Sequence, residues 1–157
     1  MTAVIDWERR HVSMRSHTAL HALSGVVWRD YRAWVTGGAI ELGGSARMDF
    51  ELERMSAALG AEIEARLNDE VLADRPVSIH FLPRDQALAD PSLIRTKVNL
   101  VPTSVDPIRV VDIEGLDRQA DGGTHVRSTL EIGPVRVVKT ESKGKAFKRM
   151  RIQLEVP

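Results

Sequence analysis

Apolar residues recur three or four positions apart in two long stretches of this chain, which is the spacing of one buried helix face. The first stretch predicts a helix over residues 7–28, which no proline interrupts. The second predicts a helix over residues 52–71, which stops at Asp74-Arg75-Pro76 because proline cannot continue a helix. The apolar positions that define the two helices are Val12, Ala19, Leu23, Val26 and Val27, and Leu52, Met55, Leu59, Ile63, Leu67 and Val71.

Shorter apolar or alternating runs predict strands between and after these helices. Gly37-Gly38 and Gly43-Gly44 bracket a short strand or hairpin at residues 39–42, and residues 83–89 predict a short helical turn before an irregular stretch that Asp90-Pro91 begins. The strands are clustered rather than alternating strictly with helices, which favours an α+β fold with a mostly antiparallel sheet and two main helices. We expect one domain over residues 1–157, with further strands at 45–51, 77–82, 108–113, 135–140 and 150–156.

Composition narrows the class of protein without identifying its chemistry. A chain of 157 residues with 43% hydrophobic and 28% charged residues is ordinary for a globular domain. No apolar run approaches the roughly 20 residues that a membrane-spanning helix needs, and the N-terminal residues have no features of a signal peptide. The complete absence of cysteine suits the cytoplasm.

Charge is balanced overall but unevenly distributed. The net charge is zero, yet residues 136–151 hold seven basic residues against the single acid Glu141, while the remainder holds 15 basic and 21 acidic residues. Such a segment indicates a local surface for a polyanion. Equally, it is typical of a solvated strand pair whose lysines discourage aggregation at a sheet edge.

Two groups of residues carry candidate metal chemistry. His17 and His21 are four apart in the first predicted helix and therefore project from one side, beside its apolar stripe rather than within it. Asp121 and His125 are also four apart, across Gly122-Gly123, whose backbone freedom lets both side chains turn toward one centre. Either pair alone is weak, since surface histidine pairs and Gly-Gly turns are common. Together, three imidazoles and one carboxylate would suit Zn²⁺.

These motifs resemble the editing domain of alanyl-tRNA synthetase and the stand-alone alanyl-tRNA editing proteins. The segments that carry the resemblance run from about Asp6 to Glu155 in the expected order. They are Asp6-Trp7-Glu8-Arg9-Arg10, Met14-Arg15-Ser16-His17-Thr18-Ala19-Leu20-His21, Gly44-Ser45-Ala46-Arg47-Met48-Asp49-Phe50, Gly122-Gly123-Thr124-His125-Val126 and Glu131-Ile132-Gly133.

The resemblance implies a zinc-dependent hydrolase acting on the acceptor end of mischarged tRNA(Ala), with seryl-tRNA(Ala) as substrate and glycyl-tRNA(Ala) possible across the family. The family's metal motif is His-x-x-x-His followed by Cys-x-x-x-His, and Asp121 stands here at the cysteine position. A carboxylate is a harder ligand than a thiolate, so the metal would be more Lewis acidic. The chain shows no ATP-binding aminoacylation core and resembles the short form of these editors.

Within that expectation, specific residues receive roles. Thr36 is the first candidate to read the seryl hydroxyl and Thr18 the second, since a site that hydrogen-bonds a hydroxyl rejects an analogue lacking it. Gly37 and Gly38 would let the substrate approach the backbone closely. The candidate phosphate contacts are Lys143, Lys145, Lys148 and Arg149.

Three alternative functions can be weighed, and the first of them, a zinc endopeptidase, is a poor match. The first helix reads His-Thr-Ala-Leu-His, without the glutamate that a zinc endopeptidase of this spacing uses as its base. The editing domain of threonyl-tRNA synthetase shares the motif logic, although the strand around Met48 resembles the alanyl type. A metal-stabilised RNA-binding module without hydrolysis is the rival from another class, because four protein ligands leave no open position on a tetrahedral ion.

Overall fold

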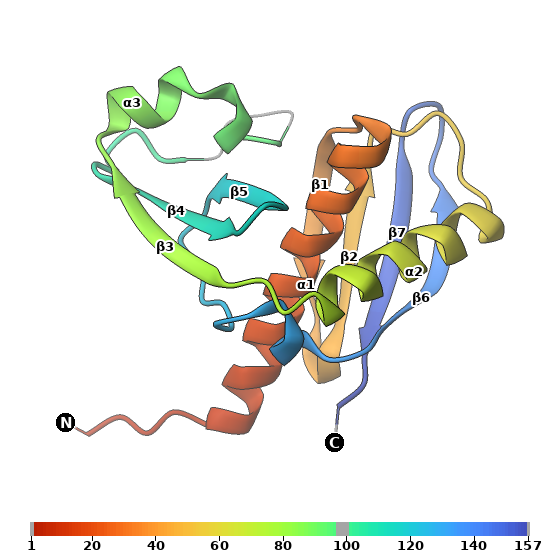
Figure 1. The fold of residues 1–157 in the computed structure, drawn as a ribbon, viewed down its shortest axis with the longest axis horizontal. Coiled ribbons are helices and arrows are strands. Elements are labelled where there is room, and N and C mark those ends of the chain that lie inside the picture. The colour runs from red at the N-terminus through yellow and green to blue at the C-terminus, as the bar shows by residue number, and fades with distance from the viewer. Residues whose placement is uncertain (1, 97–100, 157) are drawn as a thin grey trace.

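The computed structural model describes residues 2–96 and 101–156, in which two antiparallel sheets pack on either side of one long helix (Figure 1). The first sheet has the strand order β1-β2-β7-β6 and the second the order β3-β4-β5. The strands are β1 (Val35–Ile40), β2 (Ser45–Phe50), β3 (Val77–Leu82), β4 (Ile108–Ile113), β5 (Asp117–Ala120), β6 (Val135–Ser142) and β7 (Lys148–Leu154). This arrangement confirms the predicted α+β class.

Helix α1 (Trp7–Tyr31) is the central element. Its start is fixed by Asp6, whose side chain accepts a hydrogen bond from the Arg9 N–H at 3.1 Å. It extends three residues beyond the predicted end and is buried almost continuously from Arg15 to Val27, because both sheets contact it. Gly25 permits the close approach of the second sheet, since a Cβ there would lie 2.8 Å from Cγ of Leu116.

Helix α2 (Ala57–Leu72) lies beside α1 on the same face of the four-stranded sheet (Figure 1). It begins five residues later than the apolar spacing predicts, because the Ser56 side chain caps it by accepting from Leu59 N–H. Leu52 and Met55 still pack against the core, but from the irregular segment before the helix. Because Leu52 and Met55 have helical spacing without being helical, the predicted start of α2 was wrong.

Two hydrophobic cores result from this layering. The larger lies between the two helices and the four-stranded sheet, where β7 buries alternate residues and presents the others on the opposite face. The smaller core contains Ala87, Leu93, Ile108 and Val110 and lies between the second sheet and the segment holding α3 (Arg84–Ala89) and the 3₁₀ turn η2 (Pro91–Leu93). Further 3₁₀ turns are η1 (Leu42–Gly44) and η3 (Thr129–Ile132).

The remaining sequence predictions held in part. The turn at Lys143-Gly144-Lys145 does join two strands, and the strand predicted at residues 39–42 forms earlier, as β1. The short strand β5 was not predicted, because its sequence Asp-Arg-Gln-Ala has no apolar alternation. Among the described residues, no helix is long and apolar enough to cross a membrane.

Candidate metal centre

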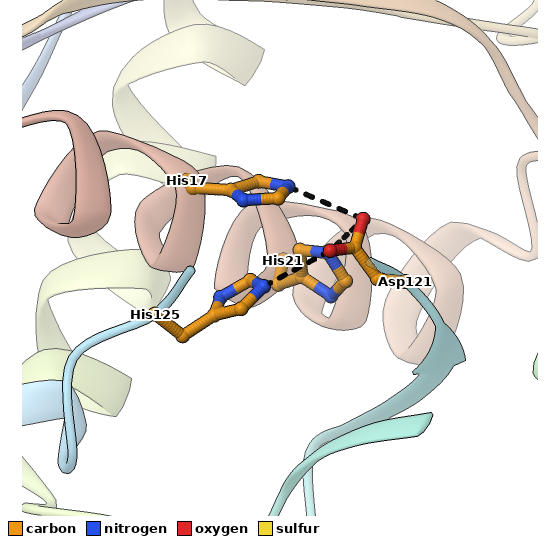
Figure 2. A group of neighbouring side chains, drawn as sticks. All are labelled: His17, His21, Asp121 and His125. Carbon is orange, nitrogen blue, oxygen red and sulfur yellow. Dashed lines mark hydrogen bonds and ion pairs between the residues drawn. The ribbon is translucent and has the colours of Figure 1, made fainter. Parts of the chain in front are cut away.

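His17, His21, Asp121 and His125 meet at one point, as their paired spacing predicts (Figure 2). The two histidines of α1 face the end of β5, where Asp121 leaves the strand and His125 follows in the loop toward η3. One ligand atom from each of the four residues lies within 4.8 Å of the other three. Two segments that lie about a hundred residues apart in the sequence thus form one cluster.

The distances from the histidines to Asp121 are close to those expected around a tetrahedral ion. A zinc ion with bonds of about 2.0–2.1 Å keeps its ligand atoms roughly 3.3–3.4 Å apart. Here Nε2 of His17 and Nε2 of His125 each lie 3.3 Å from a carboxylate oxygen of Asp121, and Nε2 of His21 lies 3.6 Å from one. The residues present therefore fit a metal ion.

Each histidine ring is fixed by a different neighbour. Nδ1 of His125 lies 3.2 Å from Oγ1 of Thr18, whose hydroxyl donates to the Met14 carbonyl at 2.9 Å. Because that hydroxyl has one proton, Nδ1–H of His125 donates to Thr18 and Nε2 is left with its lone pair toward the cluster. Nδ1 of His21 lies 3.0 Å from Oδ2 of Asp117. The ring of His17 stacks on that of His125, with centroids 4.2 Å apart.

Electrostatics favour an anionic carboxylate at the centre of the cluster. Burial raises the pKa of Asp121, but the interactions with the imidazoles of His125, His17 and His21 outweigh it and hold the pKa far below the usual range. Burial lowers the pKa of His125 to about 4, although the bond to Asp121 opposes this. Burial also acts to lower the pKa of His21, but its bonds to Asp117 and Asp121 raise it to about 9.

A cavity of about 890 Å³ opens beside the cluster. His17, His21 and Asp121 form part of its wall, and β1 contributes Thr36, Gly37 and Gly38. Thr36 is the extra residue of a β-bulge, since the register between β1 and β2 shifts between Val35 and Gly37. A bulge redirects the side chain of its extra residue. Oγ1 of Thr36 is buried and has no hydrogen-bond partner within the structure described.

Thr18 does not reach this cavity. It is fully buried, and its hydroxyl forms hydrogen bonds with the Met14 carbonyl, the Val126 N–H and the His125 ring. The prediction that Thr18 reads a substrate hydroxyl is therefore corrected. Its hydroxyl positions His125 instead.

The predicted phosphate contacts separate into two groups. Lys148 is only 4% exposed and donates to the Gly144 carbonyl at 2.6 Å, because it lies on the core side of β7. Arg149 forms a bidentate pair with the buried Asp49, at 2.7 and 2.9 Å. Neither side chain is therefore available on the surface that was predicted to contact phosphates. Lys143 and Lys145 are exposed at the turn, with Lys143 3.1 Å from Glu141.

Comparison with known proteins shows which families the chain resembles. Residues 108–151 match the family model described as the threonyl and alanyl tRNA synthetase second additional domain. That segment contains Asp121 and His125 of the cluster. This segment of the chain is therefore similar to that domain family.

Similarity extends well beyond the matched segment. The chain is 38% identical over 146 residues to the alanyl-tRNA editing protein AlaX-M of Saccharolobus solfataricus, covering 93% of this chain and 60% of that protein. It is 37% identical over 150 residues to AlaX-M of Methanosarcina barkeri, covering 96% and 61%. Alanine–tRNA ligase of Methanococcus maripaludis is 36% identical over 140 residues, covering 87% of this chain and 15% of the ligase. The chain spans about 60% of the length of the AlaX-M relatives.

Sequence reasoning missed the residues behind the ligands. Asp117 and Gln119 alternate with Asp121 along β5, so the three side chains face α1 together. Arg95, from the segment after η2, also reaches Asp117, at 2.6 Å. The sequence carries no clear signal for them, because the polar Arg118 lies between Asp117 and Gln119 and breaks any alternation of polar and apolar residues.

Proposed function

We propose that this chain is a zinc-dependent aminoacyl-tRNA hydrolase that removes serine, and less readily glycine, from mischarged tRNA(Ala). The observation that carries the proposal is the cluster of three histidines and an aspartate beside a cavity that Thr36 also lines. The names of the AlaX-M relatives, which are alanyl-tRNA editing proteins, support the same activity.

Zinc is the proposed metal because of the donor set. Three imidazole nitrogens and one carboxylate oxygen are ligands that zinc accepts in tetrahedral geometry. When bound, zinc would supply Lewis acidity that anchors the substrate or polarises a water beside the ester carbonyl. Thr18 and Asp117 hold His125 and His21 with Nε2 toward the ion, so the protein arranges its ligands before the metal arrives.

Thr36 would select the amino acid to be removed. Oγ1 of Thr36 is closed off from solvent and has no partner among the described residues, so turning this side chain toward a bound serine hydroxyl would give it one. Alanine has no hydroxyl and would leave Oγ1 unpaired, which costs about 1–3 kcal/mol for a buried polar group. Discrimination of the two amino acids follows from this difference. Gly37 and Gly38 add no side chain to the wall and leave the edge of β1 open to the substrate.

The rest of the tRNA would extend over the surface around the cavity. Lys143 and Lys145 are exposed at the end of the β6–β7 hairpin, on the far side of the four-stranded sheet from β1. With strands about 4.8 Å apart, that turn lies a few base pairs away from an amino acid bound at β1. The two lysines would therefore contact phosphates of the acceptor stem rather than its terminal adenosine, and add affinity without reading sequence.

A second candidate function is a metal-stabilised tRNA-binding module without hydrolysis. Asp121 favours it, because a carboxylate that joins three imidazoles completes a tetrahedral set and leaves no position for water. Hydrolysis then requires either a fifth ligand position or a water that the metal does not bind.

The deciding experiment is deacylation of seryl-tRNA(Ala) and alanyl-tRNA(Ala) by purified protein, with zinc added or removed by a chelator. We expect seryl-tRNA(Ala) to be hydrolysed selectively, and the activity to disappear with chelator and in His17→Ala. His80→Ala is the matched control, since His80 is exposed on β3 and bonds only Ser78 among the described residues. A protein that binds tRNA and zinc but hydrolyses no mischarged tRNA would support the binding module.

A further inference from the structure

Asp117 is a buried carboxylate immediately behind the metal cluster. It is the first residue of β5, and its side chain is completely shielded from solvent. Oδ2 lies 3.0 Å from Nδ1 of His21, the ring nitrogen that faces away from Asp121. Asp117 is too far behind the imidazole to be a ligand of the same ion, so its presence needs another explanation.

Two other side chains hold the carboxyl group of Asp117 in place. Nη1 of Arg95 donates to Oδ1 at 2.6 Å, and Nε2 of Gln119 donates to Oδ2 at 2.8 Å. Gln119 also donates to Ser24 of α1 at 3.2 Å, so that the carboxylate is fixed relative to the helix that bears His21. A buried carboxylate without such partners would be strongly destabilising.

We propose that Asp117 is a positioning residue for the metal, acting through His21, and that Arg95 keeps it in place. The inference rests on the metal centre of the proposed function. Asp117 accepts the Nδ1 proton, which fixes the tautomer and the orientation of the ring and leaves Nε2 as the ligand. A carboxylate on the far nitrogen also makes the imidazole a stronger donor.

The three imidazoles of the cluster are supported unequally. His21 has a carboxylate on its far nitrogen, and His125 has the neutral hydroxyl of Thr18. Within the described residues, Nδ1 of His17 bonds to no such group, and its ring lies against Gly123. His21 is consequently the strongest nitrogen donor, and loss of Asp117 reduces metal affinity more than loss of the Thr18 hydroxyl does.

Arg95 has a second effect on the charge of the centre. The charge of a divalent ion would be balanced by the two carboxylates of Asp121 and Asp117. The guanidinium of Arg95, which lines the cavity, makes the net charge of this group +1. Its plane lies over the Trp28 ring, 5.6 Å from the centroid, which holds it in the wall. The Arg95–Asp117 pair thus strengthens His21 without cancelling the charge that attracts an ester carbonyl.

Metal affinity tests the proposal independently of catalysis. Zinc binding by the whole chain would be measured by competition with a chromophoric chelator, for the parent, Asp117→Asn and Thr18→Val. We expect Asp117→Asn to lower zinc affinity about 10- to 100-fold, and Thr18→Val to lower it less. Asp112→Asn is the matched control on the neighbouring strand, where the carboxylate pairs with Arg118 outside the cluster. Equal affinity in Asp117→Asn and the parent would overturn the proposal.

Nuclear magnetic resonance of the zinc-loaded parent gives a test that needs no variant. The ring nitrogens of His21 should show Nε2 bound to zinc and a protonated, hydrogen-bonded Nδ1 in slow exchange with water. Coordination through Nδ1 would overturn the proposal even if Asp117→Asn failed to fold. A parent that binds zinc in this way but hydrolyses no mischarged tRNA would refute the proposed function and leave the role of Asp117 intact.

Discussion

The backbone of Gly123 lies directly against the imidazole of His17. A Cβ at this position would overlap Cε1 of the ring, lie 2.6 Å from Nδ1 and approach Oδ1 of Asp121 at 3.1 Å. The adjacent Gly122 has nothing within 4 Å of the equivalent position. The two glycines of the metal motif therefore have different roles, and only the second is required by close packing.

We predict that Gly123→Ala displaces His17 and lowers zinc affinity at least tenfold, whereas Gly122→Ala changes it little. The physical reason is the overlap at Gly123, which the ring can relieve only by leaving its place beside Asp121. Chelator competition measures both variants, and thermal unfolding confirms that each is folded. Equal zinc affinity in the two alanine variants would contradict the geometry.

Replacing Asp121 by cysteine should increase zinc affinity. A thiolate is a softer and more strongly donating ligand than a carboxylate, and Asp121 already lies within 3.3–3.6 Å of the three histidine Nε2 atoms. The same chelator competition compares Asp121→Cys with the parent under reducing conditions. If the two proteins bound zinc equally, Asp121 would not be a ligand.

Thr36→Val should abolish much of the preference for serine over alanine. Valine has the shape of threonine without the hydroxyl, so the ratio of seryl- to alanyl-tRNA(Ala) hydrolysis should fall about tenfold or more. Stability should be unchanged or higher by up to about 1 kcal/mol, because a buried unpaired hydroxyl is removed. An unchanged ratio of the two rates would refute the assignment of Thr36 as the reader.

Asp30 should contribute stability that depends on pH. Its hydrogen bond with Arg29, with a further one to Arg66 on α2, lowers its pKa to about 2, although burial opposes this. Because the folded pKa lies below the unfolded value of about 3.9, the contribution is present above pH 4 and is lost as pH falls toward 2. Asp30→Asn should lower the free energy of unfolding by about 1 kcal/mol at pH 7, and by less near pH 3. Urea unfolding at the two pH values checks this, and an equal loss at both would contradict it.

The exposed lysines should add affinity for tRNA that is sensitive to salt. Replacing both Lys143 and Lys145 by glutamine should weaken tRNA binding and reduce the slope of log affinity against log salt by up to two counterions. Fluorescence anisotropy with labelled tRNA at several salt concentrations measures both quantities. A slope identical to that of the parent would show that the turn does not contact phosphates.

Local sequence patterns predicted the first helix and its histidine pair, but not the start of the second helix. The helix that bears His17 and His21 was predictable because its apolar spacing and the histidine spacing have the same period. The late start of α2 was not, since Leu52 and Met55 are apolar because they pack on the core from an irregular segment. Side chains that are hydrophobic for tertiary reasons are indistinguishable from a helical stripe in one sequence.

The supporting residues of the site were beyond prediction for a different reason. Asp117 and Arg95 meet only because β5 pairs with β4 and the chain after η2 pairs with the start of β1 at Val35. The burial of Lys148 likewise follows from its register opposite Phe50, which places it on the core side of the sheet. Each of these facts depends on strand pairing between distant segments, which residue types alone do not specify.

The separation of the ligands along the chain has a consequence for biosynthesis. His17 and His21 leave the ribosome long before Asp121 and His125, and the two pairs lie together only when the end of β5 is packed against α1. A nascent or wrongly paired chain therefore has a histidine pair without its counterpart. A chain that ends before Asp121 therefore lacks half of the residues of the cluster and cannot assemble the proposed metal site.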